Sequence, residues 1–139
     1  MVLLTIINFN SIAQTISAKP IYKDGPEIRE MNESGGIIFL YQDSDYQTIV
    51  KTISFSVNSK AKAIDIIDKA LFMLDMEKTE KDQDISDMIE KVQLKRYGFS
   101  QKTIYISSEN KNAIGLDKKR LLKIKNALET YSYRYEVNK

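Results

Sequence analysis

The clearest constraint on the fold is a run from residue 48 to 57 in which apolar and polar residues alternate, interrupted only by Lys51. The apolar side of this run comprises Ile49, Ile53, Phe55 and Val57. A period of two indicates a β-strand with one buried and one solvated face, as in antiparallel sheets. The apolar segment Ile37 to Gln42 also has strand length, so the two segments predict a hairpin over residues 36–57.

Helical periodicity follows this hairpin. Asn58-Ser59 supplies an N-cap, because a serine side chain can accept a hydrogen bond from a free amide of the first helical turn. Apolar residues then recur every three or four positions to about Met76, which predicts an amphipathic helix packed on a sheet. Its stripe comprises Ala63, Ile64, Ile67, Ala70, Leu71 and Leu74. Asp117 is the predicted N-cap of a last helix, whose stripe comprises Leu121, Ile124, Leu128 and Tyr131.

The pattern between these two helices is less regular. Residues 77–84 are all polar or charged and predict an exposed linker. A short apolar stripe over residues 85–92 predicts a further short helix, although residues 92–94 can equally begin a strand. Residues 102–107 alternate and predict a strand with its isoleucines buried, and the tail from 131 to 137 can form a short final strand.

These segments together predict an α+β fold, with a small antiparallel sheet and two main helices packed on one face. A length of 139 residues suits one domain, which we assign to residues 19–139. Asp24-Gly25-Pro26 predicts a turn ahead of the first predicted strand. No later apolar run has the length of a membrane span, so no transmembrane segment is predicted.

Residues 1–18 carry no charge and resemble part of a secretory signal peptide. An apolar stretch is followed by two small-residue sites, at which cleavage would fall after Ala13 or Ala18. The positively charged start of a signal peptide is missing, and two asparagines interrupt the apolar stretch. Export of residues 19–139 to the periplasm or the medium is therefore one prediction. The alternative is a cytoplasmic protein in which Leu3 to Phe9 forms a buried first strand.

The absence of His and Cys excludes several classes of chemistry. A Ser-His-Asp triad, a cysteine nucleophile and a Cys/His zinc site are all impossible in this chain alone. The run Asp82 to Asp87 begins like a calcium loop, but it lacks the glycine and the glutamate that such a loop requires. We therefore predict no catalytic, cofactor-binding or metal-binding residues. The sequence favours a non-catalytic domain that acts by binding a protein or another macromolecule.

Charge is distributed unevenly along the chain, although the net charge is only +2. Up to Glu90 there are 9 basic and 15 acidic residues, and from Lys91 onward there are 12 basic and 4 acidic residues. The two halves can neutralise each other through space, or their poles can bind a charged protein partner. The candidate partner-binding residues are Lys95, Arg96, Lys102, Lys119 and Lys123.

The alternative function is a cytoplasmic nucleic-acid-binding or regulatory protein that uses the basic C-terminal half. A nucleic-acid surface combines cations with aromatic rings that stack on bases. The sequence supplies this mixture around residues 95–105, in Lys95, Arg96, Tyr97, Phe99, Lys102 and Tyr105. However, the basic residues of the last predicted helix are spread around it, and the isoelectric point of about 8.6 is modest for this class.

Overall fold

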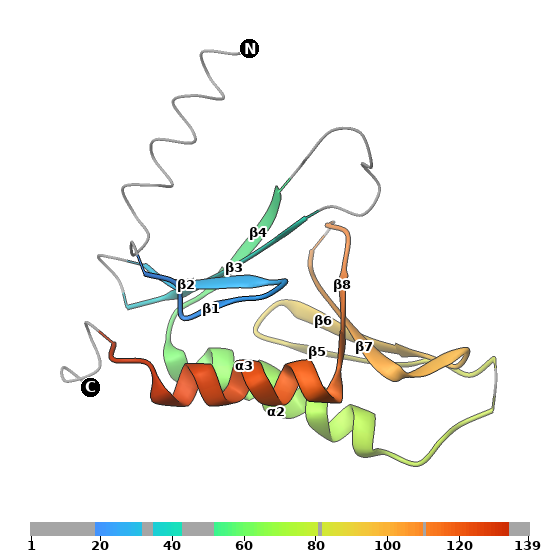
Figure 1. Ribbon diagram of the computed structural model, residues 1–139. Coiled ribbons are helices and arrows are strands. Elements are labelled where there is room, and N and C mark those ends of the chain that lie inside the picture. The colour runs from blue at the N-terminus through green and yellow to red at the C-terminus, as the bar shows by residue number, and fades with distance from the viewer. Residues whose placement is uncertain (1–18, 32–34, 43–51, 81, 110, 134–139) are drawn as a thin grey trace, which may run out of the picture.

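The computed structural model of the protein describes residues 19–31, 35–42, 52–80, 82–109 and 111–133. The predicted signal peptide or first strand within residues 1–18 lies outside the described residues. The start of the alternating run and the end of the predicted C-terminal strand lie outside them as well. Figure 1 shows the chain arranged as two sheets above a pair of helices.

The first sheet has four antiparallel strands in the order β1-β2-β3-β4. Their bounds are β1 Tyr22–Lys23, β2 Glu27–Glu30, β3 Ile37–Gln42 and β4 Thr52–Val57. The predicted hairpin is confirmed, since β3 pairs with β4 from Ile37 opposite Val57 to Gln42 opposite Thr52. The predicted turn at residues 24–26 connects β1 to β2. Alternate side chains of β3 and β4 are buried, and the rings of Phe39 and Phe55 stack with centroids 4.8 Å apart.

The second sheet also has four antiparallel strands, in the order β5-β6-β7-β8. Their bounds are β5 Ile85–Ile89, β6 Val92–Tyr97, β7 Ser100–Ser108 and β8 Ile114–Asp117. The predicted strand over residues 102–107 is confirmed as part of β7, with Ile104 and Ile106 buried. The predicted short helix over residues 85–92 is wrong, because this segment forms β5 and begins β6. The alternative of a strand beginning at Val92 is confirmed.

The turn between β5 and β6 has an unusual sequence, which explains why this hairpin was not predicted. Ile89 pairs with Val92, so Glu90 and Lys91 are the only two residues of the turn. Both have positive φ, 53° and 65°, as in a type I′ hairpin turn. Such turns usually contain Asn-Gly, Asp-Gly or Gly-Gly. The pair Glu-Lys gives no turn signal in the sequence, and its left-handed backbone costs free energy that the paired strands must offset.

The two helices are α2 (Lys60–Asp75) and α3 (Lys118–Thr130). Both predicted N-caps are confirmed: Ser59 Oγ accepts a hydrogen bond from Lys62 N at 3.3 Å, and Asp117 Oδ1 accepts one from Arg120 N at 2.9 Å. The helices lie side by side along the underside of both sheets (Figure 1). The buried residues of α3 are the predicted Leu121, Ile124 and Leu128. The buried face of α2 differs from the predicted stripe and comprises Ala63, Ile66, Ile67, Ala70 and Met73.

The α+β class and the antiparallel pairing are confirmed, but the strands form two sheets rather than one. The helix α2 and the linker after it separate β4 from β5, so each set of strands pairs only within itself. Both sheets and both helices nevertheless contribute to one hydrophobic core. A hydrogen bond from Tyr41 Oη to the carbonyl of Asn112, 2.6 Å long, also connects β3 to the segment between β7 and β8.

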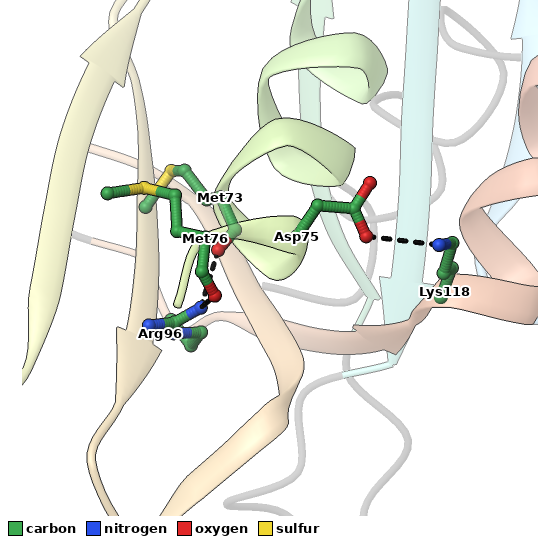
Figure 2. A network of polar contacts seen from close by, with 5 residues as sticks. All are labelled: Met73, Asp75, Met76, Arg96 and Lys118. Carbon is green, nitrogen blue, oxygen red and sulfur yellow. Dashed lines mark hydrogen bonds and ion pairs between the residues drawn. The ribbon is translucent and has the colours of Figure 1, made fainter. Parts of the chain in front are cut away.

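A buried arginine from the second sheet completes the C-terminal end of α2. Arg96 is only 1% exposed, on the same face of β6 as Val92 and Leu94. Its Nη1 donates to the carbonyls of Met73 at 2.7 Å and Met76 at 3.0 Å, as Figure 2 shows. Its Nη2 donates to the carbonyl of Glu77 at 3.0 Å. The last carbonyls of a helix lack intrahelical donors and carry partial negative charge. The guanidinium supplies both the missing donors and a compensating positive charge.

We expect Arg96→Met to lower the free energy of unfolding by about 3 kcal/mol, because it leaves buried carbonyls without donors. Arg96→Lys should recover only part of this loss, because a lysine cannot reproduce the planar fork of donors. Denaturant unfolding measures both effects. Lys95→Met is the matched control, since it removes a charge from the adjacent, solvent-facing position and should change stability by less than about 0.5 kcal/mol. A stability of Arg96→Met equal to that of the control would contradict the capping role.

We expect Lys91→Gly to raise the free energy of unfolding by about 0.5 to 1 kcal/mol, because glycine adopts positive φ without steric cost. Lys91→Ala is the control: it removes the same charge but keeps a Cβ atom, so it should give no such gain. Parallel denaturant titrations of the two variants provide the measurement. Equal stabilities would show that the charge of the turn, rather than its backbone conformation, determines the effect.

Candidate functional site

A basic cleft lies where the C-terminal end of α2, β7 and the N-terminal end of α3 meet. Its volume is about 560 Å³, and Leu74 and Met76 form the apolar part of its wall. Four lysines from three different elements also line it, namely Lys78, Lys102, Lys118 and Lys119. Because β8 leads directly into α3, the Asp117 cap places two of these lysines in the first turn of the helix at the edge of the cleft.

Only one of the four cleft lysines, Lys118, forms an ion pair with another described residue. Lys118 Nζ forms an ion pair with Asp75 Oδ1 at 3.0 Å (Figure 2). Within the described part of the chain, the ammonium groups of Lys78, Lys102 and Lys119 make no hydrogen bond or ion pair. Two carboxylates, those of Glu77 and Asp117, also line the cleft, but they are fewer than the four lysines. The cleft therefore concentrates positive charge, to which the N-terminal end of the α3 dipole adds.

A smaller hollow extends this positive surface along α3. Its volume is about 250 Å³, and its lining includes Lys119, Lys123, Arg120 and Asp24. Arg120 Nη1 donates to the carbonyl of Gly25 at 3.1 Å, which connects α3 to the turn between β1 and β2. Lys119 lines both hollows, so it joins Lys102 on one side to Lys123 on the other.

The structure thus brings together three of the five residues proposed from sequence, Lys102, Lys119 and Lys123. Lys95 lies on the other side of the second sheet, with its Nζ 4.8 Å from the ring centroid of Tyr97 and 3.8 Å from Asp84 Oδ2. Arg96 lines the cleft but is buried, and its guanidinium is engaged by the end of α2. It is therefore not an exposed cation for a partner, in contrast to what the sequence suggested.

Two cleft lysines were not identified from the sequence. Lys118 directly follows the predicted N-cap Asp117. Its position in the first turn of the helix could have been used to place it beside Lys119. Lys78 gave no such signal. It lies in the polar linker, and its place in the cleft depends on how the linker leaves α2 beside Arg96.

Ion pairs neutralise much of the remaining charge. Carboxylates of β5 and its turn pair with lysines of α2, Asp87 with Lys69 at 2.7 Å and Glu90 with Lys62 at 3.4 Å. The hydrogen bond from Lys69 lowers the pKa of the Asp87 carboxyl below its usual value. Three further ion pairs join the basic half to the acidic half: Lys95 with Asp84 at 3.8 Å, Lys118 with Asp75 at 3.0 Å and Lys125 with Asp68 at 2.7 Å. These three support the interpretation that oppositely charged segments neutralise each other through space. Lys102 and Lys119 are basic-half residues of the cleft that form no ion pair with a described residue.

The aromatic residues near the candidate lysines form a separate cluster. The ring of Tyr97 lies 5.1 Å from that of Phe99 and 5.1 Å from that of Tyr105, measured between centroids. None of these three rings lines the basic cleft. Strand alternation places Lys95 and Tyr97 on one face of β6 and Arg96 on the other, so the mixture of cations and aromatics in the sequence is divided between two surfaces.

Among the described residues, no cluster of three or more acidic, histidine or cysteine side chains could hold a metal ion. No helix in the described segments is both long and apolar enough to cross a membrane. Comparison with protein-family models, curated proteins and solved structures finds no match. The functional argument therefore rests on the chemistry of the cleft.

Proposed function

We propose that residues 19–139 form an exported, non-catalytic domain that binds an acidic segment of a protein partner in the basic cleft. The observation that carries this proposal is the group of three lysines around one concave surface, Lys78, Lys102 and Lys119, which form no ion pair with any residue that the structure describes. Like charges held close together repel one another, and carboxylates bound between them relieve that repulsion. Such complementarity also steers a partner toward the cleft and makes its association sensitive to salt.

The composition of the cleft favours a protein ligand over a nucleic acid. Met76 is 40% exposed and lies with Leu74 among the lysines, which gives apolar side chains of a partner a surface to cover. Single-stranded nucleic acids also gain affinity from aromatic rings on which bases stack, and the cleft offers none. The nucleic-acid alternative would use the same lysines, so the binding experiment must include both ligands.

We expect the double variant Lys102→Glu/Lys119→Glu to bind a fluorescein-labelled oligoglutamate peptide at least about tenfold more weakly than the parent chain. Each substitution replaces a positive charge of the cleft by a negative one, which repels the glutamates of the peptide. Fluorescence anisotropy at low and at physiological salt gives the affinities, and the affinity of the parent chain should fall as salt rises.

Lys91→Glu is the control, because it reverses an exposed charge at the turn between β5 and β6, outside the cleft. It should retain most of the affinity for the peptide. A labelled oligothymidylate is measured in parallel. Binding of the oligothymidylate alone, with loss in the double variant, would establish the nucleic-acid alternative, and binding of neither ligand would overturn the proposed function.

We further expect the mature protein to begin at Gln14 or Lys19 and to occur outside the cytoplasm, because residues 1–18 carry two small-residue cleavage sites. The gene is expressed with its natural upstream DNA, and the intact mass of the product is measured in each cell fraction. A full-length product confined to the cytoplasm would contradict export and favour the cytoplasmic alternative.

A further inference from the structure

A phenylalanine is strongly exposed at the tip of the hairpin formed by β6 and β7. Tyr97 pairs with Ser100, so Gly98 and Phe99 alone form the tip. Phe99 is 72% exposed, and one face of its ring stacks on Tyr97. An exposed aromatic cluster of this kind is typical of contact surfaces, where aromatic side chains supply much of the binding energy.

The tip is held in place by polar contacts that leave Phe99 uncovered. Gly98 N donates to Asp84 Oδ1 at 3.0 Å, and Gln101 Nε2 donates to the carbonyl of Gly98 at 3.0 Å. Gln101 also exchanges two hydrogen bonds with the backbone of Thr79, at 2.9 Å and 3.0 Å. A side chain presented on a braced backbone loses little conformational entropy when it binds, so the arrangement is preorganised for contact.

The same bracing residue connects the tip to the basic cleft. Gln101 lines the cleft, and Thr79 follows the cleft residue Lys78 directly in the chain. Phe99 lies two residues before Gln101, a separation of about 7 Å along an extended strand. The rings of Tyr97 and Phe99 lie outside the cleft, so a peptide would have to pass from the cleft over the end of the hairpin beside Gln101 to reach them.

We propose that the basic cleft and the aromatic tip bind one continuous protein segment, with acidic residues in the cleft and an apolar anchor side chain against Phe99 and Tyr97. This inference rests on the proposed function and specifies its partner. The charges around the tip give the segment a direction. The linker that braces the tip carries Glu80 and Asp82, whose carboxylates make no ion pair with any described residue. Their negative charge disfavours acidic side chains and nucleic-acid phosphates in this part of the surface, so we place the acidic residues of the segment in the cleft and a non-acidic anchor at the tip.

Two fluorescein-labelled peptides test this inference, both with the same run of glutamates. One carries a leucine and a phenylalanine beyond the glutamates, and the other carries serines there. We expect Phe99→Ser to weaken binding of the anchored peptide about tenfold and to change binding of the serine peptide by less than about twofold. Because Phe99 is exposed, the variant should keep the circular dichroism spectrum of the parent chain.

Phe72→Ser is the matched control, since Phe72 is 62% exposed on α2 and does not line the cleft. It should leave both affinities unchanged. Equal affinity of the Phe99→Ser and parent chains for the anchored peptide, with binding still dependent on Lys102 and Lys119, would overturn this inference and leave the proposed function standing. Failure of both peptides to bind would overturn both. Phe99-dependent binding of oligothymidylate, or Phe99-dependent self-association in sedimentation, would assign the tip to a nucleic acid or to a second copy and likewise overturn it.

Discussion

The guanidinium of Arg96 is the contact on which the arrangement of the second sheet and the helices depends. It donates hydrogen bonds to three backbone carbonyls at the end of α2, a helix that has no basic residue in its last turn and no glycine after it. Without this arginine the end of α2 would need water or another cap, and burial against β6 leaves little access to water. The core packing and the helix end are therefore coupled through one side chain.

The cleft is a consequence of the same contact. Because Arg96 ends α2 against the second sheet, the linker leaves the helix beside β7, and Lys78 and Met76 lie near the start of α3. The ion pair of Lys118 with Asp75 joins the two helices at the same place (Figure 2). A buried cation thus organises the backbone, and the exposed cations around it remain available to a ligand. The buried Arg96 that caps α2 and the exposed lysines to which we assign binding are therefore neighbouring but different residues.

The sequence predicted those elements whose periodicity is local. The alternation in β4 and β7, both helix N-caps and the buried leucines and isoleucine of α3 depend on neighbours in the chain, and they were confirmed, whereas the buried face of α2 was predicted only in part. The hairpin of β5 and β6 was missed because Glu90-Lys91 forms a turn that usually requires glycine or asparagine, and the tertiary pairing overrides that preference. For the candidate site, Lys102, Lys119 and Lys123 were proposed from charge alone, and the structure places them along adjoining hollows. Arg96 is buried because it lies two and four residues after Leu94 and Val92, on the same face of β6. This could be predicted only once β6 was recognised as a strand.

The helix α2 also connects the two sheets mechanically. Only two residues, Asn58 and the cap Ser59, separate it from β4, and its last carbonyls bind Arg96 from β6. Its number of residues therefore determines both the spacing and the relative rotation of the sheets. Each residue of an α-helix turns the chain by about 100°, so an insertion or a deletion in α2 would point the terminal carbonyls away from Arg96. The identity of the exposed residues in α2 can vary during evolution, whereas its length cannot change without rebuilding the junction between the sheets.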